Sequence, residues 1–438
     1  MPLVVVLGAV GLALLSLLLP SEPTYDPWAW IVWSREVAEG SLSTTNGPSW
    51  KPLPVVLTTP FALLGDDLAP AAWLVIARAG GLVAVAMTYR LGARLAGPWA
   101  GALAGVALAF ADEYVRNFAR GNSEGLLVAL ILLAVERHLD GARRTAFGLA
   151  LGAALLRPEI WPLLGLYGLY LLIRVPGSRL LVVLGFVALA GLWLGPEYLG
   201  SGNALRASDR ARQPNPGAAA FADLPFFEVF RRSSGVLMVP VLLGAAVGLV
   251  TAARARQRLP LVFGGVALLL MVTVAAMTQA GYAGNLRYVA LPAALLCAVA
   301  GAGWVRVARR SPALAVVVGL ASVPFVVETF GDWSEDLRLT RDEAALYGEL
   351  ESAVAVAGGA DRVRACGRIY TGRFDTIALA WRLHVPIRRV EIFPSAPGTL
   401  IASKRFSLTR PRRSALSLDP RYPAVGATRR WVIRARCD

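Results

Sequence analysis

Two side chains of opposite charge near the start of the sequence, Asp26 and Lys51, have the types needed for group-transfer chemistry. Asp26 stands in the segment Tyr25-Asp26-Pro27-Trp28, and Lys51 is one of two lysines among forty-four Lys plus Arg. Arginine fills the other basic positions, so an ammonium at position 51 points to a specific need. A carboxylate can deprotonate a hydroxyl, and an ammonium can hold a phosphate.

Proton transfer falls to a carboxylate, because the sequence has only two histidines, His138 and His384. His138 falls in a predicted cytoplasmic loop and His384 in the tail, so the membrane domain cannot assemble a Ser-His-Asp triad or a multi-histidine zinc site. A GxxxxGK[ST] phosphate loop is also missing, which argues against an ATP-driven pump. Asp26 is the preferred base, since it opens a short amphipathic helix predicted over 27–39 among aromatic residues that can stack on a sugar. The alternative is a capping aspartate inside an aromatic belt.

A second carboxylate, Glu124, begins the predicted fourth apolar span directly after Asn122 and Ser123. Arg116 and Arg120 precede it, so a carboxylate and two guanidiniums are expected on the same side of the membrane as the predicted base. The alternative is helix capping by the serine or asparagine, with the glutamate complementing the helix dipole.

Asp112 and Glu113 end the predicted third span on that same side. Asp112 is a candidate metal ligand together with Glu124, since carboxylates suit Mg²⁺ and Mn²⁺. The alternative is a pair of solvated acidic residues in a short loop. The sequence therefore leaves two possibilities open, a divalent metal or none.

Cations on the outer side complete the candidate site. Arg157 ends the predicted fifth span in Arg157-Pro158-Glu159, and Arg287-Tyr288 begins the tenth. Basic residues are disfavoured in short translocated loops, so each invites an explanation such as phosphate binding. For Arg157, a local ion pair with Glu159 explains the sequence equally well.

The composition is that of a polytopic membrane protein. The 438 residues are 56% hydrophobic and 17% charged, too apolar for a soluble enzyme. We predict an all-α membrane domain with about eleven transmembrane helices, several near or below the ~20 residues that a crossing needs. The apolar stretches are 3–20, 71–89, 98–111, 125–135, 145–156, 162–173, 180–195, 236–252, 259–277, 288–305 and 312–327.

Arginines in alternate short loops set the orientation, because basic loops stay in the cytoplasm. They place the N-terminus inside, and the loops 21–70 and 196–235 outside together with the tail. The first loop contains the interfacial helix, and the second is expected to be an irregular flap over an external cavity. The expected location is the cytoplasmic membrane of a bacterium.

The predicted domains are a membrane domain, 1–328, and a small extracytoplasmic α/β domain, 329–438. Between 361 and 438 there are seventeen Lys plus Arg and five Asp plus Glu. A basic domain outside the membrane suits anionic headgroups, phosphate-bearing lipids or acidic glycans rather than nucleic acid. Cys366 and Cys437 lie in this domain, either as a disulfide or as two free thiols.

Together these residues resemble the GT-C superfamily of polyprenyl-phosphate-sugar-dependent membrane glycosyltransferases. This group contains protein O-mannosyltransferases, the lipid A aminoarabinose transferase and actinobacterial mannosyl- and arabinosyltransferases. The resemblance covers the topology and roughly the first three hundred residues, and many relatives have two acidic residues in the first loop where this chain has one followed by proline. The matching positions are Asp26, Lys51-Pro52-Leu53-Pro54, Glu124, Arg287-Tyr288 and Pro292.

The resemblance implies an inverting transfer of a sugar, mannose or arabinose, from a polyprenyl phosphate to a hydroxyl of a glycan, lipid or protein. Asp26 would take the proton of that hydroxyl, while Lys51, Arg287 and Arg157 would hold the donor phosphate. Other side chains would bind the sugar or the acceptor, with the glutamate also able to support a metal. They are Tyr25, Trp28, Arg116, Arg120, Glu124 and Tyr288.

Two other classes of protein are consistent with part of the sequence. A transporter or flippase for a lipid-linked sugar would also use external cations and aromatic residues, but it normally has related halves and polar residues at mid-membrane. The apolar spans here are mainly Leu, Val, Ala and Gly. A non-catalytic membrane scaffold leaves Asp26, Lys51 and Glu124 unexplained.

Overall fold

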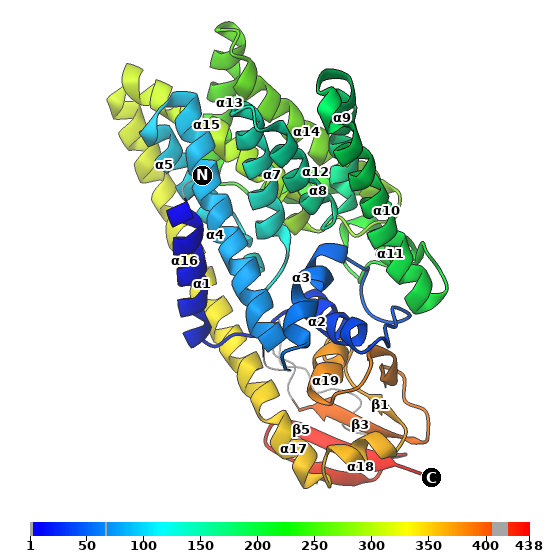
Figure 1. The fold of residues 1–438 in the computed structure, drawn as a ribbon. Helices are drawn as coiled ribbons and strands as arrows, with labels where there is room; N and C mark the ends of the chain where they lie inside the picture. The colour runs from blue at the N-terminus through cyan, green and yellow to red at the C-terminus, as the bar shows by residue number, and fades with distance from the viewer. Residues whose placement is uncertain (1–2, 66–67, 405–418) are drawn as a thin grey trace.

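The computed structural model describes residues 3–65, 68–404 and 419–438. The chain forms a bundle of long helices with a small α/β unit at one end (Figure 1). Helix α16 (Pro312–Gly348) starts beside the bundle and reaches the α/β unit, so it runs without a break across residue 328, where the domain boundary was predicted.

Each predicted apolar stretch coincides with a helix. Within the described residues, five helical stretches, built on α4, α10, α14, α15 and α16, are long and apolar enough to cross a membrane, while the other bundle helices are shorter. The chain is thus a multi-pass membrane protein, and eleven crossings stay a prediction. The bundle helices besides α16 are α1 (Leu3–Leu15), α4 (Leu68–Ala96), α5 (Pro98–Ala109), α7 (Glu124–Leu139), α8 (Arg143–Ala154), α9 (Trp161–Arg174), α10 (Arg179–Ser201), α13 (Val239–Arg254), α14 (Arg258–Gln279) and α15 (Ala290–Arg310).

Small residues let the central helices pack closely. A Cβ atom at Gly301 of α15 would lie 2.1 Å from the carbonyl oxygen of Ala100 in α5, and one at Gly303 would lie 2.0 Å from that of Gly244 in α13. Close backbone approach through glycine is typical of membrane helices, which associate through packing rather than through the hydrophobic effect. These contacts fix α15, whose N-terminal end leads into the candidate site.

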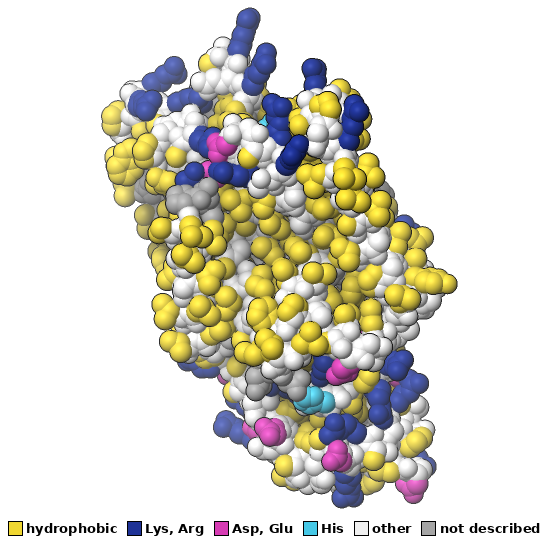
Figure 2. All heavy atoms as spheres, viewed as in Figure 1, with side chains coloured by type: hydrophobic (Ala, Val, Ile, Leu, Met, Phe, Trp, Pro, Cys, Tyr) yellow, Lys and Arg dark blue, Asp and Glu magenta, His cyan; other side chains and the backbone are white. Residues whose placement is uncertain are grey.

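The surface is divided into an apolar belt between two basic ends (Figure 2). The loops between α9 and α10 and between α13 and α14 lie at the end of the bundle away from the α/β unit. Arg174 and Arg254 lie in or beside these loops, which were predicted to be cytoplasmic. The α/β unit occupies the other end.

Helices α2 (Tyr25–Ala38) and α3 (Pro52–Ala62) lie between the bundle and the α/β unit. Helix α2 was predicted to lie exposed in the membrane interface, but it is buried on nearly all sides. Trp30 packs edge-on against Trp73 of α4, and Arg35 donates hydrogen bonds to backbone carbonyls of the α/β unit, including that of Trp381. The helix is therefore part of the core that joins the two parts.

The α/β unit has a five-stranded sheet in the order β2-β1-β3-β5-β4. Strand β1 is parallel to β2 and β3, with α19 as the crossover, while β5 is antiparallel to β3 and β4. Cys366 and Cys437 form a disulfide. The elements are α17 (Leu350–Val356), α18 (Ala360–Ala365), β1 (Arg368–Tyr370), α19 (Thr376–Arg382), η6 (Ile387–Arg389), β2 (Val390–Glu391), β3 (Gly398–Ser403), β4 (Ala424–Ala427) and β5 (Trp431–Arg436).

The unit has the mixture of helices and strands that was predicted for a small α/β domain. Short helical segments also occur in the connections of the bundle, including the 196–235 loop, which was expected to be irregular. They are η1 (Ser16–Leu18), α6 (Tyr114–Ala119), η2 (Pro158–Ile160), η3 (Pro176–Ser178), α11 (Arg206–Ala211), η4 (Ala219–Phe221), α12 (Pro225–Ser233) and η5 (Leu286–Val289).

Candidate active site

A cavity of about 1130 Å³ lies between the bundle, helix α2 and the α/β unit. Its wall contains both charged residues on which the sequence prediction depended, together with four of the other candidates. Those predicted residues are Tyr25, Asp26, Lys51, Arg157, Arg287 and Tyr288.

Local backbone structure sets the positions of Asp26 and Lys51. Asp26 lies in the first turn of α2. Lys51 directly precedes Pro52, which begins α3, and it has the extended backbone expected before proline. Its ammonium lies 3.3 Å from the Ser123 hydroxyl and 4.8 Å from the centre of the Trp30 ring, so α2 and the start of α7 hold it from two sides.

Arg287 connects three segments that are distant in sequence. Its Nη2 donates to Oδ2 of Asp26 at 2.7 Å, and its Nη1 donates to Oδ1 of Asn122 at 2.9 Å. Its Nε lies 3.6 Å from Oε1 of Glu124. The short η5 turn before α15 thus brings a guanidinium against the predicted base.

Arg157 and Glu124 form the back of this charged wall. Arg157 donates to Glu124 and, at 3.2 Å, to Oε1 of Glu159, and its guanidinium lies 3.9 Å from the centre of the Tyr288 ring. The Glu124 side chain is 2% exposed, so it lies behind the cavity wall. Its role in the fold is to hold the two guanidiniums of Arg157 and Arg287 in place.

The surroundings change the acidity of the two central groups. Burial, followed by repulsion from Arg157, lowers the pKa of Lys51 to about 7. Burial raises the pKa of Asp26, but attraction from Arg287 and Lys51 outweighs it, and the pKa lies below its ordinary value. Asp26 is therefore ionised at neutral pH, and an anion beside Lys51 would stabilise the ammonium.

Two predicted acceptor residues, Arg116 and Arg120, do not line this cavity. Arg120 is buried against Glu343 of α16, with which it forms an ion pair. Arg116 is 3.3 Å from Asp336 of the same helix. They connect α6 to α16 because α16 passes along this side of the bundle, a long-range contact that sequence spacing does not reveal.

Trp28 also lies outside the cavity wall. Its indole donates to Glu22 at 3.1 Å, and its ring packs at 6.2 Å from that of Trp381 in α19. The aromatic residues of α2 thus divide into two groups. Tyr25 reaches the cavity, whereas Trp28 packs between the bundle and the α/β unit.

The residues proposed as metal ligands do not fit a metal site. Asp112 and Glu124 border a separate void of about 20 Å³, and Glu124 is already paired with Arg157. Within the described ranges, no group of three or more His, Cys, Asp or Glu side chains is placed to hold an ion. No step of the chemistry below involves a metal.

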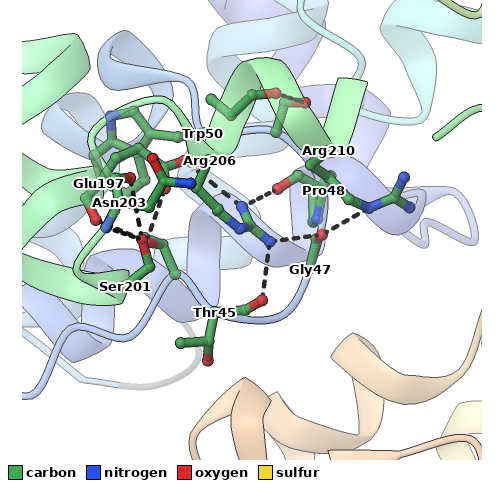
Figure 3. Close-up of polar contacts among 12 residues, drawn as sticks. Thr45, Gly47, Pro48, Trp50, Glu197, Ser201, Asn203, Arg206 and Arg210 are labelled. Atoms are coloured by element: carbon green, nitrogen blue, oxygen red, sulfur yellow. Dashed lines mark hydrogen bonds and ion pairs between the residues drawn. The ribbon is translucent and has the colours of Figure 1, made fainter. Parts of the chain in front are cut away.

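Among the arginines of the cavity wall that the sequence prediction missed are Arg206 and Arg210 on α11. As arginines in a predicted external loop they depart from the positive-inside tendency, and this departure could have identified them. Figure 3 shows the guanidinium of Arg206 among backbone carbonyls, with distances of 2.7 Å to Pro48 and 3.0 Å to Gly47. Arg206 therefore anchors the segment that ends at Lys51.

Helix α10 supports the same segment. Thr44 donates to Glu197 of α10 at 2.9 Å, and Glu197 lies 3.6 Å from Arg206. The Trp50 indole donates to the Leu192 carbonyl at 3.0 Å. The position of the Lys51 ammonium thus depends on α10 and α11 as well as on α2.

The architecture is similar to that of ArnT, a membrane protein of known structure. ArnT from Cupriavidus metallidurans, in the apo state and bound to undecaprenyl phosphate, matches with a TM-score of 0.57 and 17% identity, over 99% of this chain and 97% of ArnT. The oligosaccharyltransferase of Archaeoglobus fulgidus matches with a TM-score of 0.49 and 12% identity, over 91% of this chain and 68% of the other. No family model and no curated protein matches the sequence. At these identities the similarity establishes the fold.

Proposed function

We propose that the protein is an inverting glycosyltransferase that moves a sugar from a polyprenyl-phosphate donor to an acceptor hydroxyl. The observation that carries this proposal is the convergence of the Asp26 carboxylate and the Lys51 ammonium on one cavity. The fold supports it, since ArnT has a similar structure and binds undecaprenyl phosphate. Mannose and arabinose are the donor sugars that the sequence resemblance favours.

Lys51 and Arg287 are the groups that hold the donor phosphate. Among the described residues, no carboxylate oxygen lies within ion-pair distance of the Lys51 ammonium, so its charge is available for a ligand. Arg287 is bonded to Asp26. A phosphate that binds Arg287 competes with this bond, which makes Asp26 a stronger base once the donor is in place. Arg157 adds positive charge at the back of the wall.

The reaction is a single displacement. The acceptor oxygen attacks the anomeric carbon of the sugar, and the bond between that carbon and the phosphate oxygen breaks. Asp26 takes the proton of the acceptor hydroxyl, and the electron pair of the broken bond leaves with polyprenyl phosphate. Lys51 and Arg287 stabilise the negative charge that develops on the leaving phosphate.

An apolar wall of the same cavity suits the polyprenyl chain. The residues that α9, α10 and α14 contribute to it are mainly aromatic and aliphatic: Trp161, Phe186, Leu189, Trp193, Val274 and Met277. Many outward-facing residues of α10 are exposed apolar side chains, as expected for a helix in contact with lipid. We propose that the donor chain lies along this wall and continues into the membrane.

We propose that the cavity and the α/β unit lie outside the cytoplasmic membrane of a bacterium, with the N-terminus inside. The arginine-rich loops at the opposite end of the bundle support this orientation. The Cys366–Cys437 disulfide also supports it, because disulfides persist in oxidising compartments. In this arrangement the membrane domain, 1–328, binds the donor, and the external domain, 329–438, covers the cavity.

The test is the release of polyprenyl phosphate from a radiolabelled polyprenyl-phosphate sugar by purified protein in the presence of membrane-extract acceptors. We expect acceptor-dependent release by the wild type and none by Asp26→Asn, although that variant should still bind the labelled lipid. Full turnover by Asp26→Asn refutes the assignment of the base. Movement of the labelled lipid across sealed vesicles without cleavage would instead identify a flippase.

A further inference from the structure

The charges around the cavity are unevenly distributed between its depth and its mouth. At the charged wall, three cations and three carboxylates balance one another. We call these residues the inner set; they are Asp26, Lys51, Glu124, Arg157, Glu159 and Arg287.

Two of the charged residues nearer the mouth are also balanced. Arg206 of α11 lies 3.6 Å from Glu197, and Glu391 of strand β2 forms an ion pair with Arg368. Each of these cavity residues therefore has a partner of opposite charge.

Arg210 and Arg373 have no such partner. In the part of the chain that the structure describes, neither has a carboxylate within ion-pair distance, and both line the cavity. Arg210 donates to the backbone carbonyls of Gly47, at 3.2 Å, and Gln213, at 2.8 Å, so its position is fixed while its charge is not neutralised. Arg373 is exposed in the loop before α19. The surplus positive charge of the cavity thus lies at its mouth.

Both arginines are close to Tyr25, the neighbour of the predicted base. Phe374, which follows Arg373, packs edge-on against Tyr25 with ring centres 6.3 Å apart. Arg210 and Tyr25 line the same cavity; burial raises the pKa of Tyr25, and the positive charge of Arg210 is one of the influences that oppose this rise. A ligand that touches both arginines therefore lies next to the carboxylate that would receive the acceptor proton.

Aromatic rings at the same mouth suit a sugar. Phe393 lines the cavity and is 78% exposed, and Phe374 is 40% exposed. An exposed ring can pack on the apolar face of a sugar, while guanidiniums bind carboxylate or phosphate with paired hydrogen bonds. The neighbouring edge strand β2 and the loop before α19 bring these groups together from the α/β unit.

We propose that Arg210 and Arg373 form an anion subsite for the acceptor, and that the acceptor is an acidic glycan with a carboxylate or phosphate near the reacting hydroxyl. This inference rests on the proposed transferase function. The inner set holds the donor phosphate in the depth of the cavity, so the mouth is left for the second substrate. It also gives the external domain a role in selecting the acceptor.

The test is equilibrium binding, by fluorescence polarisation at low salt, of two labelled disaccharides that differ only in a uronate carboxylate replaced by a hydroxymethyl group. We expect the wild type to bind the acidic disaccharide more tightly, with about tenfold lost for each of Arg210→Gln and Arg373→Gln. Lys51→Met should retain the preference. Arg429→Gln, which removes an exposed arginine of the same unit away from the cavity, is the matched control.

Equal binding of the two disaccharides, or measurable binding of neither, overturns the subsite. So does a double variant that keeps the preference but loses binding to vesicles of anionic phospholipid, because the arginines would then contact lipid headgroups. A double variant whose only defect is a raised donor KM assigns them to the donor and also overturns it. A wild-type protein that prefers the acidic disaccharide but releases no polyprenyl phosphate supports the subsite and rejects the transferase.

Discussion

Two buried groups of ionisable residues in this protein differ in whether they border a cavity. The inner set borders the large cavity. A second group, which we call the junction cluster, lies where the bundle meets the α/β unit and contributes nothing to the cavity wall. It consists of Glu22, Arg120, Glu343, Tyr347, Asp375 and Arg382.

The junction cluster is bonded within itself. Glu22 accepts a hydrogen bond from Arg382 at 3.1 Å, Arg120 pairs with Glu343, and the Tyr347 hydroxyl donates to Asp375 at 2.8 Å. These bonds join α6, α16, α19 and the segment before α2. Both groups are buried and both contain ion pairs, so contact with the cavity is what distinguishes the candidate site from the junction cluster.

The sharpest test of this comparison replaces one matched carboxylate in each group. Asp26→Asn should lower acceptor-dependent release of polyprenyl phosphate by about a thousandfold, because general-base catalysis contributes roughly 10²–10⁴. Glu22→Gln removes a buried, arginine-paired carboxylate that is far from the cavity wall. It should retain the transfer rate per folded molecule, as measured by the same assay. Equal losses of transfer rate in the two variants would mean that the inner set and the junction cluster do not differ in function.

The reverse experiment disrupts an ion pair of the junction cluster. Arg120→Gln leaves Glu343 buried without its cation, which should cost about 3 kcal/mol of stability. We expect a melting temperature lower by several degrees in detergent, with donor KM unchanged at temperatures where the variant is folded. Exposed Arg338, paired with Glu335 on the same helix, provides the control substitution Arg338→Gln, which should have little effect. A raised donor KM in Arg120→Gln would mean that Arg120 takes part in substrate binding.

Lys51 provides a prediction with a pH signature. Lys51→Met should reduce kcat/KM about a hundredfold, since one charged contact to the developing phosphate is lost. In the wild type, the pKa of Lys51 is lowered to about 7, first by burial, so donor affinity should fall as the pH rises above 7 and the ammonium loses its proton. Lys51→Arg keeps its charge in this range and should show a flatter donor KM profile between pH 6 and pH 9. A wild-type donor KM that is constant over this range contradicts this role.

Much of the architecture could be predicted because membrane helices have a strong local signal. Each predicted apolar stretch coincides with a helix, and the resemblance at the positions of Asp26 and Lys51 led to a fold that is similar to the structure of ArnT. Distant contacts were not predictable in this way. Burial of α2 depends on carbonyls of the α/β unit that bind Arg35 some 350 residues later in the chain, and the pairing of Arg120 depends on the path of α16.

Residues of the site could be predicted where their type was unusual for their position in the sequence. Lys51 stood out as a rare lysine and Arg287 as an external arginine, and the structure brings both to the cavity. Arg206 and Arg210 lay in a loop that looked irregular, so their common helix could not be anticipated. Arg373 is one of many arginines in the basic tail. The net charge of the tail does not show which of these arginines lines the cavity.

The last expected effect is the pH dependence of the stability that the junction cluster contributes. Burial is the main cause that raises the pKa of Glu22 and of Asp375 to about 7 in each case. The folded protein therefore keeps protons that the unfolded chain releases from about pH 4 upward. Stability should therefore fall between about pH 4 and pH 7 and then level off. Glu343, Tyr347 and Arg382 face the same cluster and contribute to the overall profile.

The measurement is the melting temperature of each variant relative to the wild type at pH 5 and at pH 8. Glu22→Gln and Asp375→Asn remove a titrating group, so each should be relatively more stable at pH 8 than at pH 5. Asp361→Asn, at a fully exposed position of the same unit, should show no such difference. Asp26 of the inner set gives a different expectation, because its pKa is lowered and its charge is retained between pH 5 and pH 8, so Asp26→Asn should show no such difference in this range. The relative stability of a Glu22 or Asp375 variant could instead be independent of pH. That result would mean that the junction cluster keeps its carboxylates ionised, as the cavity wall keeps Asp26.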